Sequence, residues 1–595
     1  MKALWAGFVG ASLLAKIGDR GIKPLPRLLV ALGFLTFVPA RAEIGAAIPW
    51  TTVEAEAMRT TGTVLGPAYE PHRVETESSG QRCVRLERAG QQLEFTADAA
   101  CDALVIRFNL PDAPAGGGVK SALDLLVNGK VVRHLPLSSS QAWLYGDYPF
   151  SNDPRQGKAR NFYDELRVKG VPVAKGDAVG LRKTDDDGIP CIVDLVDLEL
   201  MPAPVAQPAG SLSVADFGAD GRGGTDATAA LRACVAAAQK QGRIAWVPAG
   251  DYQLTGDILV PPGVTIQGAG MWHTTFVGAD ALYGQADRRV RFKLSGAGGR
   301  LADFAIVGRL NYRNDNEAND GVVVAGATDA VVARIWVEHT KAGVWVYNGT
   351  RLVIEGCRFR DLIADGVNFC VGTNHSVVQD CTARGTGDDC YAVWPVPADQ
   401  GHDELTEKPG HNVIRRSTGQ LPFLANGGSL YGGADNRIED CLFTDITAGC
   451  GILVSTTFPT RDDAGKVDNN FSGMTVVQNC RLVRCGGYDH SWAWRAAMQI
   501  CLDRRGISGL KVRNVELRDS ISDAISVVAP GRAKGEGTLA NTVLEHVTVD
   551  GFGLGVRGRH GLWIRQDVAG GLTWIGTPVA DVSNESADFK ILSSP

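Results

Sequence analysis

Residues 352–393 read "LVIEGCRFRDLIADGVNFCVGTNHSVVQDCTARGTGDDCYAV", and this stretch contains two copies of one short pattern. Each copy has an apolar pair, a polar pair, a small or apolar residue and, eight or nine positions later, a Gly or Asp that opens the next strand. Related copies begin at Ala330, Leu352, Ser376, Asn436 and Leu510. The first three starts are 22 and 24 residues apart, which is too short for a strand–helix–strand unit and typical of one solenoid coil. The repeat therefore predicts stacked coils of short parallel strands.

One position of the repeat carries small apolar side chains. The equivalent residues are Ile335, Cys357, Cys381, Cys441, Cys480, Val515 and Val547. Because Cys alternates there with Ile and Val, we interpret it as a core residue in a stacked ladder. The chain has 13 cysteines, a number that would ordinarily indicate disulfides in a secreted protein. Cys83 with Cys101 and Cys480 with Cys485 are the pairs better suited to bridges, and the odd count leaves at least one free thiol.

The segment that precedes these coils, from Val214, reads "VADFGADGRGGTDATAALRACVAAAQKQGRIAWVPAGDYQLTGDILVPPGVTIQGAG". It resembles the start of the pectate-lyase superfamily of right-handed parallel β-helices. That resemblance implies a strand, a Gly-rich turn, one capping helix at about 225–239 and then the first coils. We therefore expect a linker at residues 204–212 and a parallel β-helix domain at residues 213–595.

Residues 46–203 have a different pattern. Short alternating runs such as "ALVIRFNL" (103–110) and "CIVDLVDLEL" (191–200) are separated by Gly, Pro and Asp turns. Many short strands at close spacing are typical of a β-sandwich. The predicted fold class is thus all-β, with a jelly-roll β-sandwich before the parallel β-helix.

Two short motifs of this first unit resemble carbohydrate-binding modules. "VEAEAM" (53–58) and "VDLVDLEL" (193–200) are similar to the first and last strands of carbohydrate-binding module families 6 and 35. The resemblance implies a structural Ca²⁺ held by Glu54, Glu56 and Asp197, and oxygen ligands suit this hard cation. The alternative is that these acids are solvated on outward strand faces.

The N-terminus resembles a signal peptide. Arg27 precedes an apolar run from Leu28 to Ala40, and a small-residue pattern ends at Ala42. The run is shorter than the roughly 20 residues that span a bilayer, so we expect residues 1–42 to be cleaved and the protein to be extracellular or periplasmic. An uncleaved anchor is the alternative. A net charge of -6 and a pI near 6.0 argue against a nucleic-acid partner.

Three aspartates lie in the segment quoted first. Asp365 follows Cys357 by eight residues and Asp389 follows Cys381 by eight, so the ladder places both in one column. Neighbouring strands are about 4.8 Å apart. Asp388 precedes Asp389, so in a regular strand its side chain points elsewhere. A close pair and an offset carboxylate match an inverting glycosidase, whose acid and base are about 6.5–9.5 Å apart.

Aspartates also cap turns where β-helix coils bend, and this is the alternative interpretation of the cluster. Asp320 and Asp523 occupy comparable positions, and we expect them only to cap turns. For the cluster of three, two close carboxylates repel one another, which keeps one protonated near neutral pH. That property would suit acid/base chemistry.

The same segment carries a closer resemblance. "DGVNFCVGTNHSVVQDCTARGTGDDCYAVWP" (365–395) and "LANGGSLYGGADNRIEDCLFTDITAGCGILV" (424–454) are similar to glycoside hydrolase family 87, the endo-α-1,3-glucanases and mycodextranases. The resemblance covers most of residues 210–530. It implies a secreted, inverting endo-hydrolase without a catalytic cofactor, whose catalytic residues are Asp365, Asp388 and Asp389. By analogy with polygalacturonases, Asp388 would be the general acid, and the other two would activate water.

The residues around the aspartates bear on the substrate. Polygalacturonases carry Gly-His-Gly and Arg-x-Lys motifs after the paired aspartates, and neither follows Asp389, so we do not expect a uronate polymer. Aromatic side chains stack on sugar rings, and the candidates are Trp394, Tyr431, Trp492 and Trp494. Candidates for binding sugar hydroxyls are Asn368, Asn426 and His490. Each of these residues has packing or structural support as its alternative role.

Two other classes of protein have a β-helix. A polysaccharide lyase needs a basic residue to abstract a proton, and the sequence places no obvious basic partner beside the trio. A non-catalytic polysaccharide-binding solenoid would tolerate neutral replacements along the coil. We therefore predict a monomeric α-1,3-glucanase acting on α-glucan, with alternating α-1,3/α-1,4-glucan (nigeran) as the alternative substrate. Subsite loops decide between the two polymers.

Overall fold

The structure is a computed structural model of the chain. The ranges that it describes are 44–148, 150–396, 408–458, 460–461, 467–468, 471–489, 493–503, 505–530, 537–555 and 557–594. The predicted signal peptide, residues 1–42, lies outside them. Across these ranges, no helix is both long and apolar enough to cross a membrane.

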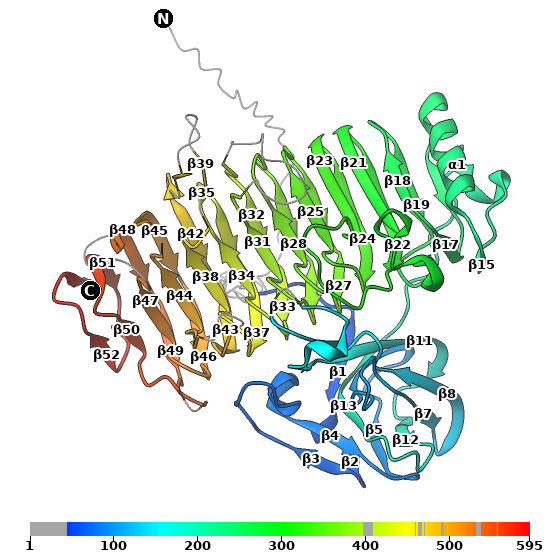
Figure 1. Cartoon of the computed structure of the whole chain (residues 1–595), viewed down its shortest axis with the longest axis horizontal. Coiled ribbons are helices and arrows are strands. Elements are labelled where there is room, and N and C mark those ends of the chain that lie inside the picture. The colour runs from blue at the N-terminus through cyan, green and yellow to red at the C-terminus, as the bar shows by residue number, and fades with distance from the viewer. Residues whose placement is uncertain are drawn as a thin grey trace, which may run out of the picture. The chain divides into compact units, whose positions relative to one another are not determined.

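Most strands of residues 50–199 form two antiparallel sheets (Figure 1). The six-stranded sheet contains β1 (Trp50–Glu54), β3 (Thr63–Leu65), β4 (Cys83–Leu86), β6 (Cys101–Asn109), β11 (Asp164–Val173) and β13 (Cys191–Glu199). The five-stranded sheet contains β2 (Arg59–Thr60), β5 (Gln92–Thr96), β7 (Lys120–Val127), β8 (Lys130–Ser138) and β12 (Ala178–Lys183). Alternate residues of the two sheets, such as Leu104, Ile106, Leu123 and Leu125, are buried in one core. The predicted β-sandwich is confirmed.

One α-helix begins the second region. α1 (Thr228–Gln241) buries Leu231, Cys234 and Val235, and Gly242 ends it in the left-handed conformation. The prediction was 225–239. The helix begins later because residues up to Asp226 belong to strand β15 (Arg222–Asp226), and the Asp226 carboxylate accepts a hydrogen bond from the Thr228 N–H at 2.9 Å.

From Leu212 onward two large sheets are built of parallel strands that follow one another in chain order (Figure 1). One sheet has 24 strands, from β14 (Leu212–Ser213) to β53 (Phe589–Ser594), and another has 12, from β18 (Asp257–Val260) to β52 (Val582–Asn584). Each strand pairs with the equivalent strand of a neighbouring coil, so the apolar interior continues from coil to coil. The predicted right-handed parallel β-helix is confirmed.

The coils around the aspartates contribute strands to both sheets. Those of the 12-stranded sheet are β23 (Val322–Thr328), β25 (Val344–Tyr347), β28 (Val367–Phe369), β31 (Tyr391–Val393), β34 (Gly428–Leu430) and β38 (Ile452–Ser455). Those of the 24-stranded sheet are β22 (Arg300–Val307), β24 (Val331–Glu338), β27 (Arg358–Arg360), β30 (Thr382–Arg384), β33 (Thr418–Gln420), β37 (Leu442–Ile446) and β43 (Arg481–Cys485). The sequence pattern missed the coil of β33 and β34, because Ser417 stands at its ladder position.

The ladder follows the strand register. Arg358 pairs with Thr382, Thr382 with Thr418 and Thr418 with Leu442, so the residues before them stack in one line. Cys357, Cys381 and Cys441 are all buried, as predicted. The residue before each ladder position turns the chain, and Asp380 and Asp440 adopt φ of 55° and 56° there. Asp is among the few L-residues that enter this left-handed region readily.

The predicted disulfides are wrong, because all 13 cysteines are free and buried. Cys480 directly precedes strand β43, which ends at Cys485, and the two thiols lie against different carbonyl oxygens, that of Ile438 at 3.8 Å and that of Phe443 at 3.4 Å. Cys83 pairs with Leu65, whereas Cys101 pairs with Val173, so the second pair also sits on separate parts of the sandwich.

The sandwich contacts the coils through buried ion pairs. Arg358 of β27 binds Glu199 of β13 through two hydrogen bonds of 2.7 Å. Arg384 of β30 contacts Glu165 of β11 and binds Asp197 of β13 at 2.7 Å. Their side chains are at most 9% exposed. A charge that is buried this far is costly unless it is paired, so each domain supplies the partners for the buried charges of the other.

Candidate active site

The strand register places Asp365 and Asp389 in one column, as predicted. Val367 of β28 pairs with Tyr391 of β31, and the Gly366 N–H donates to the Asp389 carbonyl oxygen at 3.0 Å. The next coil continues the column with Asn426, because Tyr391 pairs with Gly428. The column lies just before the strands of the 12-stranded sheet, where a short turn enters each strand.

All three aspartates converge on one point. Asp365, Asp388 and Asp389 each offer a carboxylate oxygen, and these oxygens lie within 4.8 Å of one another. The predicted wide separation of Asp388 from the pair is therefore wrong. Asp388 belongs to the turn before β31 rather than to the regular strand, so strand alternation does not govern its direction. Asp388 is the most exposed of the three, with an 18% exposed side chain.

Neutral hydrogen-bond donors hold the two inner carboxylates. The Asp389 Oδ1 atom accepts bonds from the Asn426 N–H at 3.0 Å and from the Asn426 Nδ2 at 2.8 Å. The Tyr431 hydroxyl donates to the Asp389 Oδ2 at 2.9 Å. Asn368 Nδ2 donates to the Asp365 Oδ1 at 3.3 Å. These hydrogen bonds orient the aspartates. All three residues also line the cavity beside the aspartates, and the expectation that they contact sugar stays a prediction.

Arg313 is the charged partner of the third aspartate. Its Nη2 atom lies 2.8 Å from the Asp388 Oδ2, and its Nε atom donates to the Asp315 Oδ1 at 2.9 Å. The Tyr148 ring, from the sandwich, covers the guanidinium at 4.6 Å. The expectation that no basic residue lies beside the trio is wrong. Burial opposes the charge of Arg313, but Asp388 and Asp315 raise its pKa well above the usual value, so it cannot act as a lyase base.

Burial and mutual repulsion set the protonation of the inner pair. Burial, followed by the charges of Asp388 and Asp389, raises the pKa of Asp365 well above its usual range. Burial and the charge of Asp388 raise the pKa of Asp389 to about 7, although the bonds from Asn426 and Tyr431 lower it. The predicted retention of a proton near neutral pH thus has a physical basis in the structure.

The trio opens into a cavity of about 410 Å³. Trp394, predicted as a stacking residue, lines it with Trp345 and Phe458, and the Trp345 and Trp394 ring centroids are 5.8 Å apart. Trp494, also predicted, does not line this cavity and instead packs on Tyr488, with centroids 5.5 Å apart. The predicted residues His490 and Trp492 lie outside the described ranges.

Asp523 and Asp320 lie in the same column, farther along the coils. Asp523 Oδ1 accepts bonds from the Arg559 N–H and the His560 N–H, both at 2.8 Å, so it caps a turn as predicted. Asp320 is fully buried, and its Oδ1 atom lies 3.7 Å from the Nζ atom of Lys341, which lines the cavity. A column position alone therefore does not make an aspartate catalytic.

The predicted calcium ligands do not come together as a set. Asp197 is 2.7 Å from Arg384 and accepts a bond from Thr52 at 2.6 Å, so its inclusion is wrong. Strand β13 explains the error: Thr52 pairs with Asp197, whereas Glu54 pairs with Leu195, beside Asp194. Asp194 contributes a charge that raises the pKa of Glu54 to about 8, after the larger effect of burial.

One further cluster of potential metal ligands lies where the two domains meet. Asp164, His339 and Asp361 are buried, and their ligand atoms lie within 4.8 Å of one another. The His339 Nε2 atom is 2.9 Å from the Asp164 Oδ1, so a hydrogen bond already joins two members. We assign this cluster to the contact between the domains.

Sequence reasoning missed the residues that loops supply. Arg313 lies between β22 and β23, in a segment without the repeat pattern, and Tyr148 comes from the sandwich. Trp345 and Lys341 were detectable, because they belong to the coil that begins at Ala330 and lie near the predicted column. No local signal in the sequence indicated that a sandwich residue reaches the trio.

Two family profiles match the chain and cover most of it. Residues 47–201 match "Alpha-1,3-glucanase catalytic domain D1", and residues 224–564 match "Alpha-1,3-glucanase catalytic domain D2". Comparison with curated protein sequences gave no significant match.

Solved structures of similar proteins agree with the profiles. A GH87 α-1,3-glucanase catalytic unit from Streptomyces thermodiastaticus strain HF3-3 is 28% identical, with a TM-score of 0.77 over 93% of this chain and 97% of that one. The Agl-KA catalytic domain is 24% identical, with a TM-score of 0.82 over 93% and 99%. A GH87 α-1,3-glucanase in complex with nigerose is 21% identical, with a TM-score of 0.79 over 92% and 98%. With both of its domains matched by the family profiles and its aspartates gathered at one cavity, the chain belongs to the α-1,3-glucanases of glycoside hydrolase family 87.

Proposed function

We propose that the enzyme is a secreted endo-hydrolase that cleaves α-1,3-glucosidic bonds inside α-1,3-glucan, with inversion at the anomeric carbon. The observation that carries this proposal is the cluster of Asp365, Asp388 and Asp389 at the aromatic-lined cavity. Secretion and a monomeric state stay predictions.

The electrostatics support one order of proton movement. Because the pKa values of Asp365 and Asp389 are raised, the inner pair holds a proton near neutral pH, while Arg313 is paired with Asp388. Asp388 is the outermost carboxyl group, so it passes this proton to the glycosidic oxygen. The inner pair is then ionised and activates the attacking water. Transfer of a single proton thus prepares both acid and base.

The charge of the cavity favours a neutral polymer. Arg313 is bound to Asp388 and Asp315, and Lys341 lies 3.7 Å from Asp320, so neither cation is available to a uronate group. Trp394 and Trp345 offer apolar surface to sugar rings. A carboxylated polymer would also meet three aspartates and be repelled.

Product analysis tests the proposal directly. We expect incubation with α-1,3-glucan to release oligosaccharides of several lengths from the start, and nuclear magnetic resonance to show the β-anomer as the first product. Nigeran and polygalacturonate serve as comparison polymers. Initial release of the α-anomer would contradict inversion, which matters because the carboxylates are closer than the usual inverting spacing. Release of monomers alone would contradict internal cleavage.

We also propose a structural Ca²⁺ in the sandwich, held by Glu54 and Glu56. Among the described residues, the Oε2 atoms of both are buried without a hydrogen-bond partner, as a cation site requires. Burial raises the pKa of both carboxyl groups, and the charges of Asp194 and Asp445 add to this. A hard cation would relieve this repulsion with oxygen ligands. Asp194, rather than Asp197, is an acid whose charge acts on both members of the pair.

Chelation tests the calcium site. We expect a chelator to lower the melting temperature by about 5 °C, because a ligand bound only to the folded state stabilises it. Added Ca²⁺ should restore the melting temperature, whereas Mg²⁺ should not. In the Glu54→Gln variant the chelator should have little effect. An unchanged melting temperature of the wild-type protein would refute the site.

A further inference from the structure

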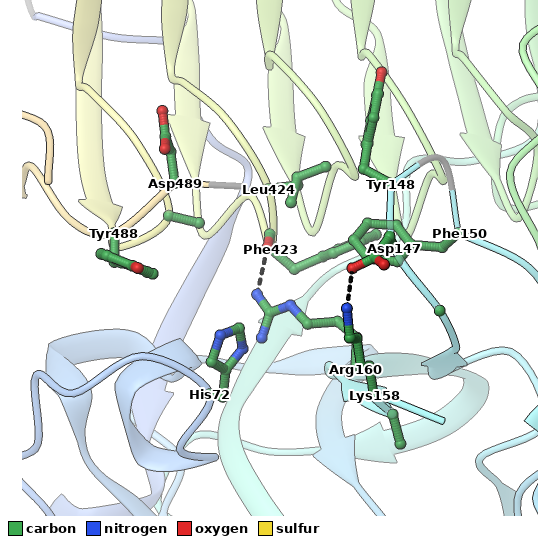
Figure 2. A pocket seen from close by; sticks show the side chains of 13 residues that line it. His72, Asp147, Tyr148, Phe150, Lys158, Arg160, Phe423, Leu424, Tyr488 and Asp489 are labelled. Carbon is green, nitrogen blue, oxygen red and sulfur yellow. Dashed lines mark hydrogen bonds and ion pairs between the residues drawn. The ribbon is translucent and has the colours of Figure 1, made fainter. Parts of the chain in front are cut away.

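A second cavity, of about 540 Å³, lies between the sandwich and the coils (Figure 2). On one side are the sandwich loops that carry His72, Asp147, Tyr148 and Lys158; on the other are residues of the β-helix, including Phe423 and Tyr488. In Figure 2, His72 and Lys158 lie on the sandwich side of the view and Tyr488 on the β-helix side, whereas Asp147 and Tyr148 reach towards the β-helix. Its volume falls within the range of small-molecule sites.

Packing and hydrogen bonds between the two domains hold the apolar wall of this cavity in place. Phe423 is 3% exposed and stacks on Phe162 of the sandwich, with ring centroids 4.1 Å apart and planes 9° apart. Arg160 donates a hydrogen bond to the Phe423 carbonyl oxygen and pairs with Glu77, so it ties the two domains together beneath the cavity (Figure 2). Tyr148 is 41% exposed and supplies a further ring at the opening.

The acidic and basic side chains around the cavity form ion pairs with one another or with neighbouring residues. Lys158 pairs with Asp147, and both side chains are more than half exposed at the rim. Asp489 pairs with Arg495, and Arg160 pairs with Glu77. The cavity thus offers apolar faces with a polar but neutral rim. This combination matches an uncharged sugar, whose ring has apolar faces and hydroxyl edges.

The two cavities adjoin one another. Tyr148 and Asp489 line both the cavity of about 540 Å³ and the cavity of about 410 Å³ that holds the aspartates. Tyr148 also covers Arg313, which binds Asp388. A polymer chain bound at the trio therefore lies next to the second cavity, and Tyr148 lines both spaces.

We propose that the second cavity is a glucan subsite, made jointly by both domains, that binds glucosyl units of the same chain that is cleaved at the trio. This inference rests on the proposed function. Tyr488 and Lys158 contact these units from opposite walls: the Tyr488 ring packs on a sugar face, and the Lys158 ammonium group bonds hydroxyl groups at the rim. The sandwich is thus part of the substrate-binding groove rather than a separate binding module.

Binding measurements in the full-length Asp365→Asn protein test the subsite. Calorimetry would compare α-1,3-linked oligosaccharides of two and six glucose units. We expect the longer ligand to bind more tightly, and Tyr488→Ala and Lys158→Ala each to weaken its binding roughly three- to tenfold. Tyr488→Phe keeps the ring and should keep the tighter binding. Lys158 is exposed, so its variant tests the subsite without disturbing the core.

The outcomes separate this inference from the proposed function. Retention of the full length-dependent gain in both Tyr488→Ala and Lys158→Ala would overturn the subsite. Equal binding of the two ligands by the Asp365→Asn protein would also overturn it while leaving the catalytic proposal intact. If that protein binds neither ligand and the wild type releases no sugar from α-1,3-glucan, the proposed function fails and the subsite fails with it.

Discussion

Asp365→Asn is expected to reduce glucan hydrolysis by about 10²–10⁴-fold while making the protein more stable at neutral pH. The loss of activity follows from removing one of the three groups that hold and transfer the proton. The gain in stability follows from burial, because Asp365 is 4% exposed and its pKa is raised well above the usual range. The buried carboxyl group of Asp365 therefore lowers the stability of the wild type at the proposed catalytic site.

The raised pKa of Asp365 determines how the free energy of unfolding changes with pH. An unfolded aspartate ionises near pH 3.9, whereas folded Asp365 keeps its proton to higher pH. Above that lower value the unfolded state binds fewer protons, so the free energy of unfolding falls as the pH rises towards the folded pKa. The asparagine side chain of the variant does not titrate, so it adds no pH dependence to the free energy of unfolding. The stability advantage of the variant should thus be absent near pH 4 and grow with pH.

Reducing-sugar assays and urea unfolding at several pH values check both effects. Asp523→Asn is the matched control, because Asp523 occupies the same column but caps a turn through the Arg559 and His560 N–H groups. The control should retain activity and gain no stability. Unchanged hydrolysis by Asp365→Asn would refute its catalytic assignment, as would an equal loss of activity in the control.

The second large effect concerns Arg384. Its side chain is 4% exposed and serves both Glu165 and Asp197 of the sandwich. Arg384→Met has similar bulk but leaves two buried carboxylates without this partner. We expect the free energy of unfolding to fall by about 3–5 kcal/mol, as is typical when one member of a buried ion pair is removed.

Arg416→Met is the control for this change. Arg416 binds Asp380 at 2.8 Å, but both side chains are more than one third exposed, so its loss should cost about 0–1 kcal/mol. Denaturant unfolding compares the two, and adding Glu165→Gln to Arg384→Met should recover part of the loss. If the two single variants lose equal stability, the buried network does not hold the domains together.

The periodic parts of the protein could be predicted from sequence. A constant coil length places Asp365 and Asp389 eight residues after their ladder cysteines, and the strand register reproduces this. Arg313 and Tyr148 could not be found this way, because they reach the trio from a loop and from another domain.

The error over Asp197 has a similar cause. Every residue of β13 is buried, so the alternation that normally reveals which side chains share a face is absent. From the sequence alone, Asp194 and Asp197 were equally suitable as the aspartate that lies near Glu54 and Glu56. Only the pairing of Glu54 with Leu195 identifies Asp194 as the neighbour of the acidic pair.

The free cysteines affect how the protein is inactivated when it unfolds. All 13 thiols are buried and none is joined to another, so no disulfide stabilises this fold. If the protein is secreted as proposed, unfolding exposes all of these thiols together to an oxidising medium. Chains that open can then become cross-linked in wrong combinations, which makes their inactivation irreversible.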